Sequence, residues 1–340
     1  MNFSSSRLEA LKQGLSVLPI LWIFVSADPL AGQDIVSQTA KTFELALGQQ
    51  LIEFTTESSS LPGDSIQVIS LHRNEDTSFP IVRTLLKTHP GQFIRISTSG
   101  GRRLSLKSGG SKSFTMDPNR MFSPAGIERD LRNFSFFSPE IAAEVQAFSK
   151  AYLNQVELRA GKTVIAVHNN TNGGYSIESY LEGGSEELAG RLVHIEEGED
   201  LDNFVLVTDL DHFEALKAAG FNTVLQDNEN APDDGSLSVY CGRNGIKYLN
   251  VEAEFGDAAE QEQMLRAAFE LATAKQAYRL PEMDGRSHSV TAPRIKVAPE
   301  GRQITSGAIS LDDSPGNRSE MQSEIRNKRE TTPIPVTERR

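Results

Sequence analysis

The stretch Ile66–Glu75 constrains this chain most, because an apolar, β-prone run ends there abruptly in polar residues. The run Ile66–Leu71 predicts a buried strand, and His72 follows it directly. Glu75 comes three positions after His72, so both side chains can reach one metal ion from a short loop. Open α/β sheets place their ligands at the carboxyl edge of the strands. The stretch therefore predicts a sheet with a metal site at that edge.

Strand-like and helix-like segments alternate along most of the chain. This alternation predicts an α/β fold with a central mixed, largely parallel sheet flanked by helices. The segment 99–113 is rich in Gly, Ser and basic residues, and it predicts a flexible loop. The expected strands cover residues 66–71, 93–97, 163–167, 204–208, 222–226 and 248–255, and the expected helices cover 79–87, 139–154, 211–219 and 257–278.

The first 27 residues have the pattern of a secretory signal peptide. Arg7 and Lys12 precede the apolar run 15–25, which ends in the small-x-small sequence Val25-Ser26-Ala27. The run is shorter than the roughly 20 residues of a comfortable membrane span. We expect cleavage after Ala27 and a secreted or periplasmic protein; an uncleaved anchor or a buried helix is the alternative.

Residues 281–340 differ in composition from the rest of the chain. Residues 282–340 contain no Phe, Tyr or Trp and a single Leu, Leu311. Such a segment buries too little apolar surface to offset its chain entropy, so we expect a disordered tail. One folded domain over residues 28–280 remains.

The composition limits both the partners and the metal ligands. Lys and Arg total 34 against 46 Asp and Glu, a net charge of −12, which argues against a nucleic-acid or anionic-membrane binder. Cys241 is the single cysteine, so a Cys-rich zinc site is excluded. A metal ion would have to be held by histidine and carboxylate. Among the six histidines, His72 and His168 directly follow predicted buried strands, and these two are the candidates.

Four sequence elements occur in a fixed order, and together they resemble the zinc carboxypeptidase superfamily, nearest its succinylglutamate desuccinylase and aspartoacylase branch. The resemblance spans roughly residues 64–256. It rests on the order of the elements, because no single motif is long. The elements are His72-x-x-Glu75, Asn119-Arg120, His168 and the late acidic strand Asn250-Val-Glu-Ala-Glu-Phe-Gly256.

The resemblance implies one Zn²⁺ per chain, held by His72, Glu75 and His168. It further implies that Asn119 and Arg120 hold a substrate carboxylate, a task suited to guanidinium because it can bind bidentately. A surface arginine paired with Asp117 is the alternative for Arg120.

The catalytic base of the family is a glutamate on a late strand, and this chain offers Glu252 and Glu254, which lie on one strand face. Asn-Val-Glu favours Glu252, whereas Glu254 resembles the Glu-x-Gly form of the aspartoacylase branch. The chain departs from that branch at Arg73, where a Gly is usual. Arg102, Arg103 and Lys112 are alternatives for the basic side chain that polarises the scissile carbonyl.

These features predict a secreted zinc-dependent amidohydrolase, either a carboxypeptidase-like peptidase or an N-acyl amino acid deacylase. Its substrate would be a small peptide or an N-acyl amino acid that bears a carboxylate. A water molecule activated by zinc and a glutamate would attack the amide. The alternative is a non-catalytic periplasmic binding protein on the same scaffold.

Overall fold

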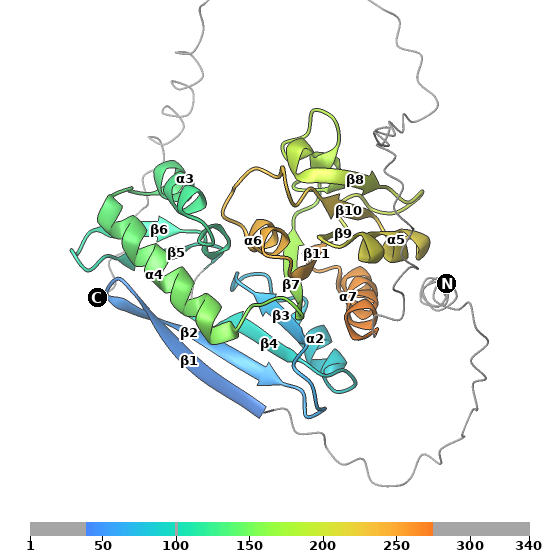
Figure 1. Ribbon diagram of the computed structural model, residues 1–340, viewed down its shortest axis with the longest axis horizontal. Helices are drawn as coiled ribbons and strands as arrows, with labels where there is room; N and C mark the ends of the chain where they lie inside the picture. Colours follow the sequence, from blue (N-terminus) through green and yellow to red (C-terminus); the bar gives the residue numbers. More distant parts are fainter. Residues whose placement is uncertain (1–38, 99–100, 275–340) are drawn as a thin grey trace, which may run out of the picture. The chain divides into compact units, whose positions relative to one another are not determined.

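The computed structural model describes residues 39–98 and 101–274. Nine strands form one sheet in the order β1-β2-β4-β3-β7-β11-β9-β10-β8, and β5 and β6 form a separate hairpin (Figure 1). The neighbours β4, β3, β7 and β11 run parallel to one another at the centre of the sheet. The predicted mixed, largely parallel sheet flanked by helices is confirmed. The predicted signal peptide and tail lie outside the described residues.

The bounds of the elements follow the chain in order. The strands are β1 (Thr39–Leu47), β2 (Gln50–Ser58), β3 (Ile66–Ser70), β4 (Gln92–Ile96), β5 (Leu104–Lys107), β6 (Ser113–Met116), β7 (Thr163–Asn170), β8 (Gly190–His194), β9 (Phe204–Val207), β10 (Thr223–Gln226) and β11 (Lys247–Glu254). The helices are α2 (Phe79–Leu85), η1 (Pro118–Arg120), α3 (Pro124–Phe134), α4 (Pro139–Val156), η2 (Ile177–Tyr180), η3 (Glu187–Ala189), α5 (Leu210–Ala218), α6 (Leu237–Arg243) and α7 (Ala258–Thr273).

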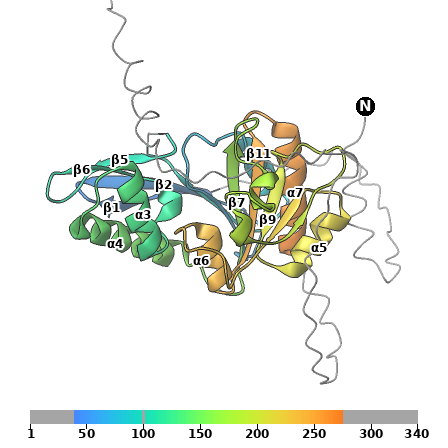
Figure 2. The same ribbon diagram turned by 90° about the horizontal axis from the view of Figure 1, so that it is seen from above.

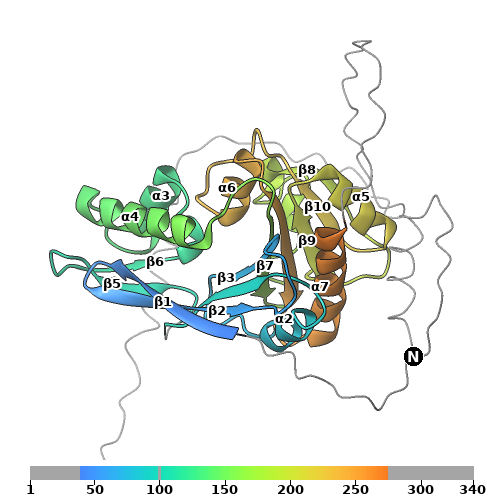
Figure 3. The same cartoon turned by 60° about the horizontal axis from the view of Figure 1, so that its bottom comes forward.

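Helices cover both faces of the sheet, and each face has its own apolar core. Helices α2, α5 and α7 pack on one face, whereas α3, α4, α6 and the β5–β6 hairpin pack on the other (Figure 3). Helix α7 lies along β7 and β11 (Figure 2). A sheet covered on both faces needs strands that are apolar throughout, which is why the strands at its centre read as continuous apolar runs.

The alternation of side chains along β7 determines where its histidine points. Ile165 and Val167 pack in the core under α7, whereas Val164 and Ala166 pack in the core under α4. Side chains alternate with period two, so His168 points to the same face as Ala166. The candidate site therefore lies on the α3–α4–α6 side, at the carboxyl ends of the parallel strands.

The structure corrects one predicted element. The segment 99–113 was predicted to be a flexible loop, but it contains strand β5 and the start of β6, which pair antiparallel from Leu104 opposite Met116 to Lys107 opposite Ser113. Leu104 and Leu106 are buried and alternate with exposed Ser105 and Lys107. This short period-two pattern was obscured by the Gly, Ser and basic residues around it.

One smaller difference concerns the length of a strand. Strand β7 continues to Asn170, so His168 lies within the strand rather than after it. Among the described residues, no helix is both long and apolar enough to cross a membrane.

Candidate metal centre

Two histidines from different strands converge on one carboxylate at the edge of the sheet. Nδ1 of His72 lies 2.9 Å from Oε2 of Glu75, and Nδ1 of His168 lies 2.7 Å from the same oxygen. One potential ligand atom from each residue lies within 4.8 Å of those of the other two. All three side chains are buried, with His72 fully inaccessible. The residues predicted to hold a metal are therefore brought together.

The local backbone explains why these residues meet. Strands β3 and β7 are parallel neighbours, so their carboxyl ends lie side by side. After β3 the chain turns, with the Glu75 amide donating to the His72 carbonyl at 3.4 Å, and this returns Glu75 toward the histidine. The side chain of Gln261 on α7 donates to the His168 carbonyl at 3.1 Å, and this hydrogen bond holds the end of β7 from the opposite face of the sheet.

Asp117 orients His72 through the other nitrogen of its ring. Nε2 of His72 lies 2.8 Å from Oδ1 of Asp117, which also accepts from the Asn119 amide as the N-cap of η1. Histidine ligands of metals commonly donate their second N–H to a carboxylate, which fixes the tautomer and the ring orientation. This arrangement leaves Nδ1 of His72 as the inward-facing ligand atom.

The charges within the cluster are strongly coupled. Burial opposes ionisation of both carboxyl groups, but His168 and His72 outweigh it at Glu75, and His72 together with two arginines outweighs it at Asp117. The pKa of each carboxyl therefore lies well below its usual range. Burial alone would lower the pKa of His72, yet its hydrogen bonds to Asp117 and Glu75 raise the pKa above the usual value. Both carboxylates therefore stay ionised, Glu75 as a candidate metal ligand and Asp117 as the hydrogen-bond acceptor of His72.

The donor set fits zinc. Two imidazole nitrogens and one carboxylate oxygen are the ligands of a common class of catalytic zinc site, which leaves a position for water or substrate. His72, Glu75 and His168 supply these atoms from a buried position, and Asp117 supplies the outer hydrogen bond that such sites require.

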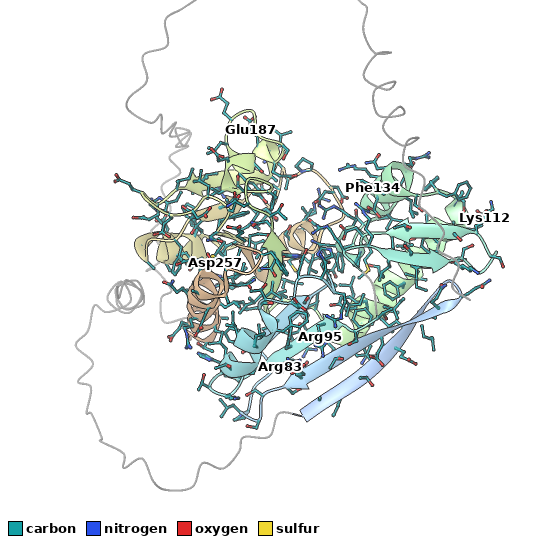
Figure 4. The ribbon with its side chains drawn as sticks, turned by 180° about the vertical axis from the view of Figure 1, so that it is seen from behind. Arg83, Arg95, Lys112, Phe134, Glu187 and Asp257 are labelled. Carbon is teal, nitrogen blue, oxygen red and sulfur yellow. The ribbon has the colours of Figure 1, made fainter. Side chains whose placement is uncertain are left out.

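Of the three basic candidates, Arg102 alone faces this cluster. Its Nη1 lies 2.8 Å from Oε1 of Glu75, and its Nε lies 3.2 Å from Oδ2 of Asp117. Arg103 points away to Asp130 at 2.8 Å. Lys112 stacks over Phe136, 4.7 Å from the ring centroid, at the tip of the β5–β6 hairpin (Figure 4). Of the three basic residues that could polarise a scissile carbonyl, Arg102 is therefore the one that the geometry favours.

The two candidate bases lie in different surroundings. Glu252 is the register partner of His168 in the parallel pair β11–β7, is buried, and accepts from Asn250 Nδ2 at 2.9 Å. Burial raises the pKa of Glu252 and outweighs the opposing effects of His168 and Asn250. Glu254 is half-buried near the strand end and accepts from Asn172 at 3.3 Å. The geometry favours Glu252.

Asn119 and Arg120 lie on η1, the turn that begins at Asp117. The amide oxygen of Asn119 accepts from the Leu237 backbone at 3.0 Å, so only its Nδ2 could donate to a substrate. Nη1 of Arg120 donates to the Asn119 carbonyl at 2.7 Å and lies 3.6 Å from Asp234. Arg120 is thus partly paired with Asp234, and its proposed role toward a carboxylate remains a prediction.

The part played by Asp117 is not evident from the sequence. The sequence suggests Asp117 only as an ion-pair partner for Arg120, whereas in the structure its carboxylate contacts His72 and Arg102. The signal was present, because an aspartate directly before Pro118 is a typical N-cap with Pro at the first helical position. An N-cap fixes the carboxylate, but the chain alone does not show which ring lies against it.

No protein-family model and no curated protein matches the sequence. Among solved structures, a metallo-carboxypeptidase from Burkholderia cenocepacia matches with a TM-score of 0.33 and 14% identity, over 68% of this chain and 63% of that chain. An aspartoacylase family protein from Mesorhizobium loti matches with a TM-score of 0.35 and 15% identity, over 72% of this chain and 69% of that chain. Any functional assignment rests on the geometry of the site itself.

Proposed function

We propose that this chain is a zinc-dependent amidohydrolase that cleaves an amide bond in a carboxylate-bearing substrate. The observation that carries the proposal is the convergence of His72, Glu75 and His168 beside the buried Glu252. A protein that only binds its ligand has no need of a metal-ligand set with a buried carboxylate next to it, so the arrangement favours catalysis over binding alone.

When bound, zinc would polarise the scissile carbonyl and lower the pKa of a water molecule towards about 7. His72 and His168 would hold it through their Nδ1 atoms and Glu75 through a carboxylate oxygen. Asp117 would keep the His72 ring in the required tautomer by accepting from its Nε2–H.

Glu252 is placed to act as the general base. It lies beside His168 at the carboxyl end of β11, and Asn250 holds one of its oxygens. The carboxylate would take a proton as water attacks the amide carbonyl and would deliver it to the leaving amine. Its burial excludes bulk water from the proton-transfer path.

Two arginines would interact with the negative charges of the substrate and of the reacting carbonyl group. Arg102 faces the cluster, so its guanidinium is positioned to stabilise the negative charge that develops on the carbonyl oxygen. Arg120 lies farther along η1 and would bind a substrate carboxylate together with Asn119 Nδ2. A carboxylate would then replace Asp234 as a partner of Arg120. The substrate class that fits is a small peptide or an N-acyl amino acid.

The proposal extends to export. Arg7, Lys12, the apolar run 15–25 and Ala27 form the signal-peptide pattern, and a secreted or periplasmic hydrolase would meet peptide substrates there. Fractionation of expressing cells and mass measurement of the mature N-terminus test this. Retention in the cytosol with an intact N-terminus would contradict it.

Activity is tested with the zinc-loaded protein on a panel of short peptides and N-acyl amino acids. Hydrolysis that releases a free amine, and that is lost when the substrate carboxylate is amidated, supports the proposal. Tight binding of a panel member by the zinc-loaded protein without any hydrolysis would favour the binding-protein alternative.

A further inference from the structure

Arg103 and Asp130 form an ion pair behind the candidate metal centre. Nη1 of Arg103 lies 2.8 Å from Oδ1 of Asp130, which is on α3. The Asp130 carboxylate is buried, whereas Arg103 is about a quarter exposed, at 28%. Its guanidinium stacks 3.6 Å from the ring centroid of Phe134, which lies one helical turn after Asp130 on the same face of α3.

The second oxygen of Asp130 connects this pair to the site. Oδ2 of Asp130 accepts from the backbone amide of Asp117 at 2.9 Å. Asp117 is the residue whose side chain contacts Nε2 of His72 and Nε of Arg102. The buried Asp130 carboxylate therefore accepts from the Arg103 guanidinium with one oxygen and from the Asp117 backbone with the other. Asp117 is the residue that orients His72.

Arg103 also connects to the site through its neighbour in the chain. Arg102 points into the cluster and Arg103 points to α3, and strand β5 begins at the next residue, Leu104. An arginine anchored by an ion pair and by an aromatic ring fixes the backbone at that point. The backbone of the preceding residue, Arg102, is then held in a defined position.

We propose that Arg103 and Asp130 act as a positioning pair, which holds the Asp117 backbone and the segment carrying Arg102 in place at the same time. Neither residue contacts the ligand atoms directly. Their effect would reach His72 through Asp117 and Glu75 through Arg102. The inference rests on the proposed metal centre and adds to it the residues that fix its outer hydrogen bonds.

The chain offers a matched control pair. Glu57 is as buried as Asp130, and it accepts from Arg83 at 2.6 Å and 2.8 Å and from Arg95 at 3.4 Å. Figure 4 shows Arg83 and Arg95 close together, with Phe134 on a different part of the molecule. Glu57→Gln removes a buried carboxylate that forms an ion pair with arginine, as Asp130→Asn does. Among the described residues, however, Glu57 has no contact with the site.

The experiment measures zinc affinity by competition with a chelator and, separately, thermal stability of the metal-free chain. Loss of an outer hydrogen-bond partner of a ligand commonly weakens metal affinity about 10- to 100-fold. Asp130 lies one step beyond that partner, so we expect a loss at the lower end of this range, about 10-fold, for Asp130→Asn. Arg103→Gln, which changes a partly exposed side chain and is the safer variant for folding, should weaken binding in the same direction. Glu57→Gln should lower stability but leave zinc affinity within about twofold of wild type.

A double-mutant cycle separates positioning from general stability. If Asp130 acts through Asp117, then Asp130→Asn should weaken zinc binding much less in an Asp117→Asn background than in wild type. Additive losses in the cycle, or wild-type zinc affinity in both Asp130→Asn and Arg103→Gln, would overturn the proposal.

A metal-free readout keeps this test independent of the proposed function. The amide of Asp117 should exchange its hydrogen faster in Asp130→Ala than in wild type, whereas Glu57→Ala should leave its exchange unchanged. If wild type bound no zinc, the proposed function would fall, and hydrogen exchange alone would decide the positioning role. Unchanged exchange of the Asp117 amide in Asp130→Ala would then reject it.

Discussion

His168 on β7 and Glu252 on β11 are register partners in adjacent parallel strands, so their side chains lie next to each other on one face of the sheet. Both are buried at the carboxyl end of the sheet, and His168 is in hydrogen-bond contact with Glu75. A candidate metal ligand and a candidate base are thereby held at fixed separation by backbone hydrogen bonds. The chemistry that we propose depends on this pairing more than on any loop.

Replacing Glu252 by Gln should strongly slow hydrolysis and leave zinc content unchanged. A general base contributes about 100- to 10,000-fold to the rate, so kcat should fall by that factor. Glu254→Gln is the matched control, since it changes the same residue type two positions along the strand, and its kcat should stay within a few-fold of wild type. The reverse order of effects would identify Glu254 as the base.

Replacing Asp117 by Asn should weaken zinc binding. Nε2 of His72 would lose its anionic acceptor, and loss of such outer partners costs about 10- to 100-fold in metal affinity. Asp209→Asn, at the N-cap of α5 and distant from the cluster in sequence and fold, should leave affinity unchanged. Chelator competition at pH 7.5 measures both, and equal affinities for the two variants would show that Asp117 does not orient a ligand.

A methyl group at Gly126 should disturb substrate binding. A Cβ at Gly126 would lie 2.2 Å from the Gly235 Cα atom, and a Cβ at Gly235 would lie 2.5 Å from the Arg120 carbonyl oxygen. The backbones of α3, of the loop that contains Gly235 and of η1 are therefore in close contact. Gly126→Ala must separate them, and we expect KM to rise roughly 10-fold or more because the Arg120 turn shifts. Gly110→Ala, whose Cβ would meet its nearest atom at 3.8 Å, is the control. An unchanged KM in folded Gly126→Ala would contradict this view of η1.

His212 on α5 should make the fold sensitive to mild acid. Burial lowers the pKa of His212 to about 4 from a usual value of 6.5, and its Nδ1 has no hydrogen-bond partner among the described residues. The unfolded chain then binds more protons than the native chain between these pH values. The contribution of neutral His212 to the free energy of unfolding is therefore complete above pH 6.5 and is lost as the pH drops towards 4.

The size of this effect follows from the two pKa values. At pH 5, protonation of His212 in the unfolded chain should lower the free energy of unfolding by about 2 kcal/mol. Urea unfolding of metal-free protein at pH 7.5 and pH 5 measures it, with His212→Leu as the comparison. The variant should lose less stability than wild type between the two pH values by about that amount. An equal loss in both proteins would show that His212 does not titrate as described.

The parts of the site that the sequence could predict are those set by local pattern. An apolar run followed at once by His72 and then by Glu75 places two ligands at a strand end, and the same pattern precedes His168. Because parallel strands end at one edge of a sheet, their convergence follows from the fold class. The base could only be narrowed to two residues, because Glu252 and Glu254 share a strand face and differ only in depth.

The remaining features depend on contacts between distant segments. Arg102 and Arg103 are adjacent and chemically identical, and only the positions of Asp130 and Phe134 on α3 determine which of them turns toward the cluster. Asp117 meets His72 across 45 positions of sequence. The β5–β6 hairpin, read as a loop, carries the segment that brings Arg102 to the site. No period or spacing within one segment contains this information.

The most direct test of the account is the metal content of the purified full chain. We predict about one zinc per chain, as for a site of this donor set, and none in the His72→Ala/His168→Ala double mutant. A His89→Ala/His194→Ala double mutant, which removes two histidines outside the cluster, should keep its zinc. Absence of zinc from the wild-type chain, even after incubation with zinc and dialysis, would show that the three ligands do not form a metal centre and would contradict the proposed hydrolase.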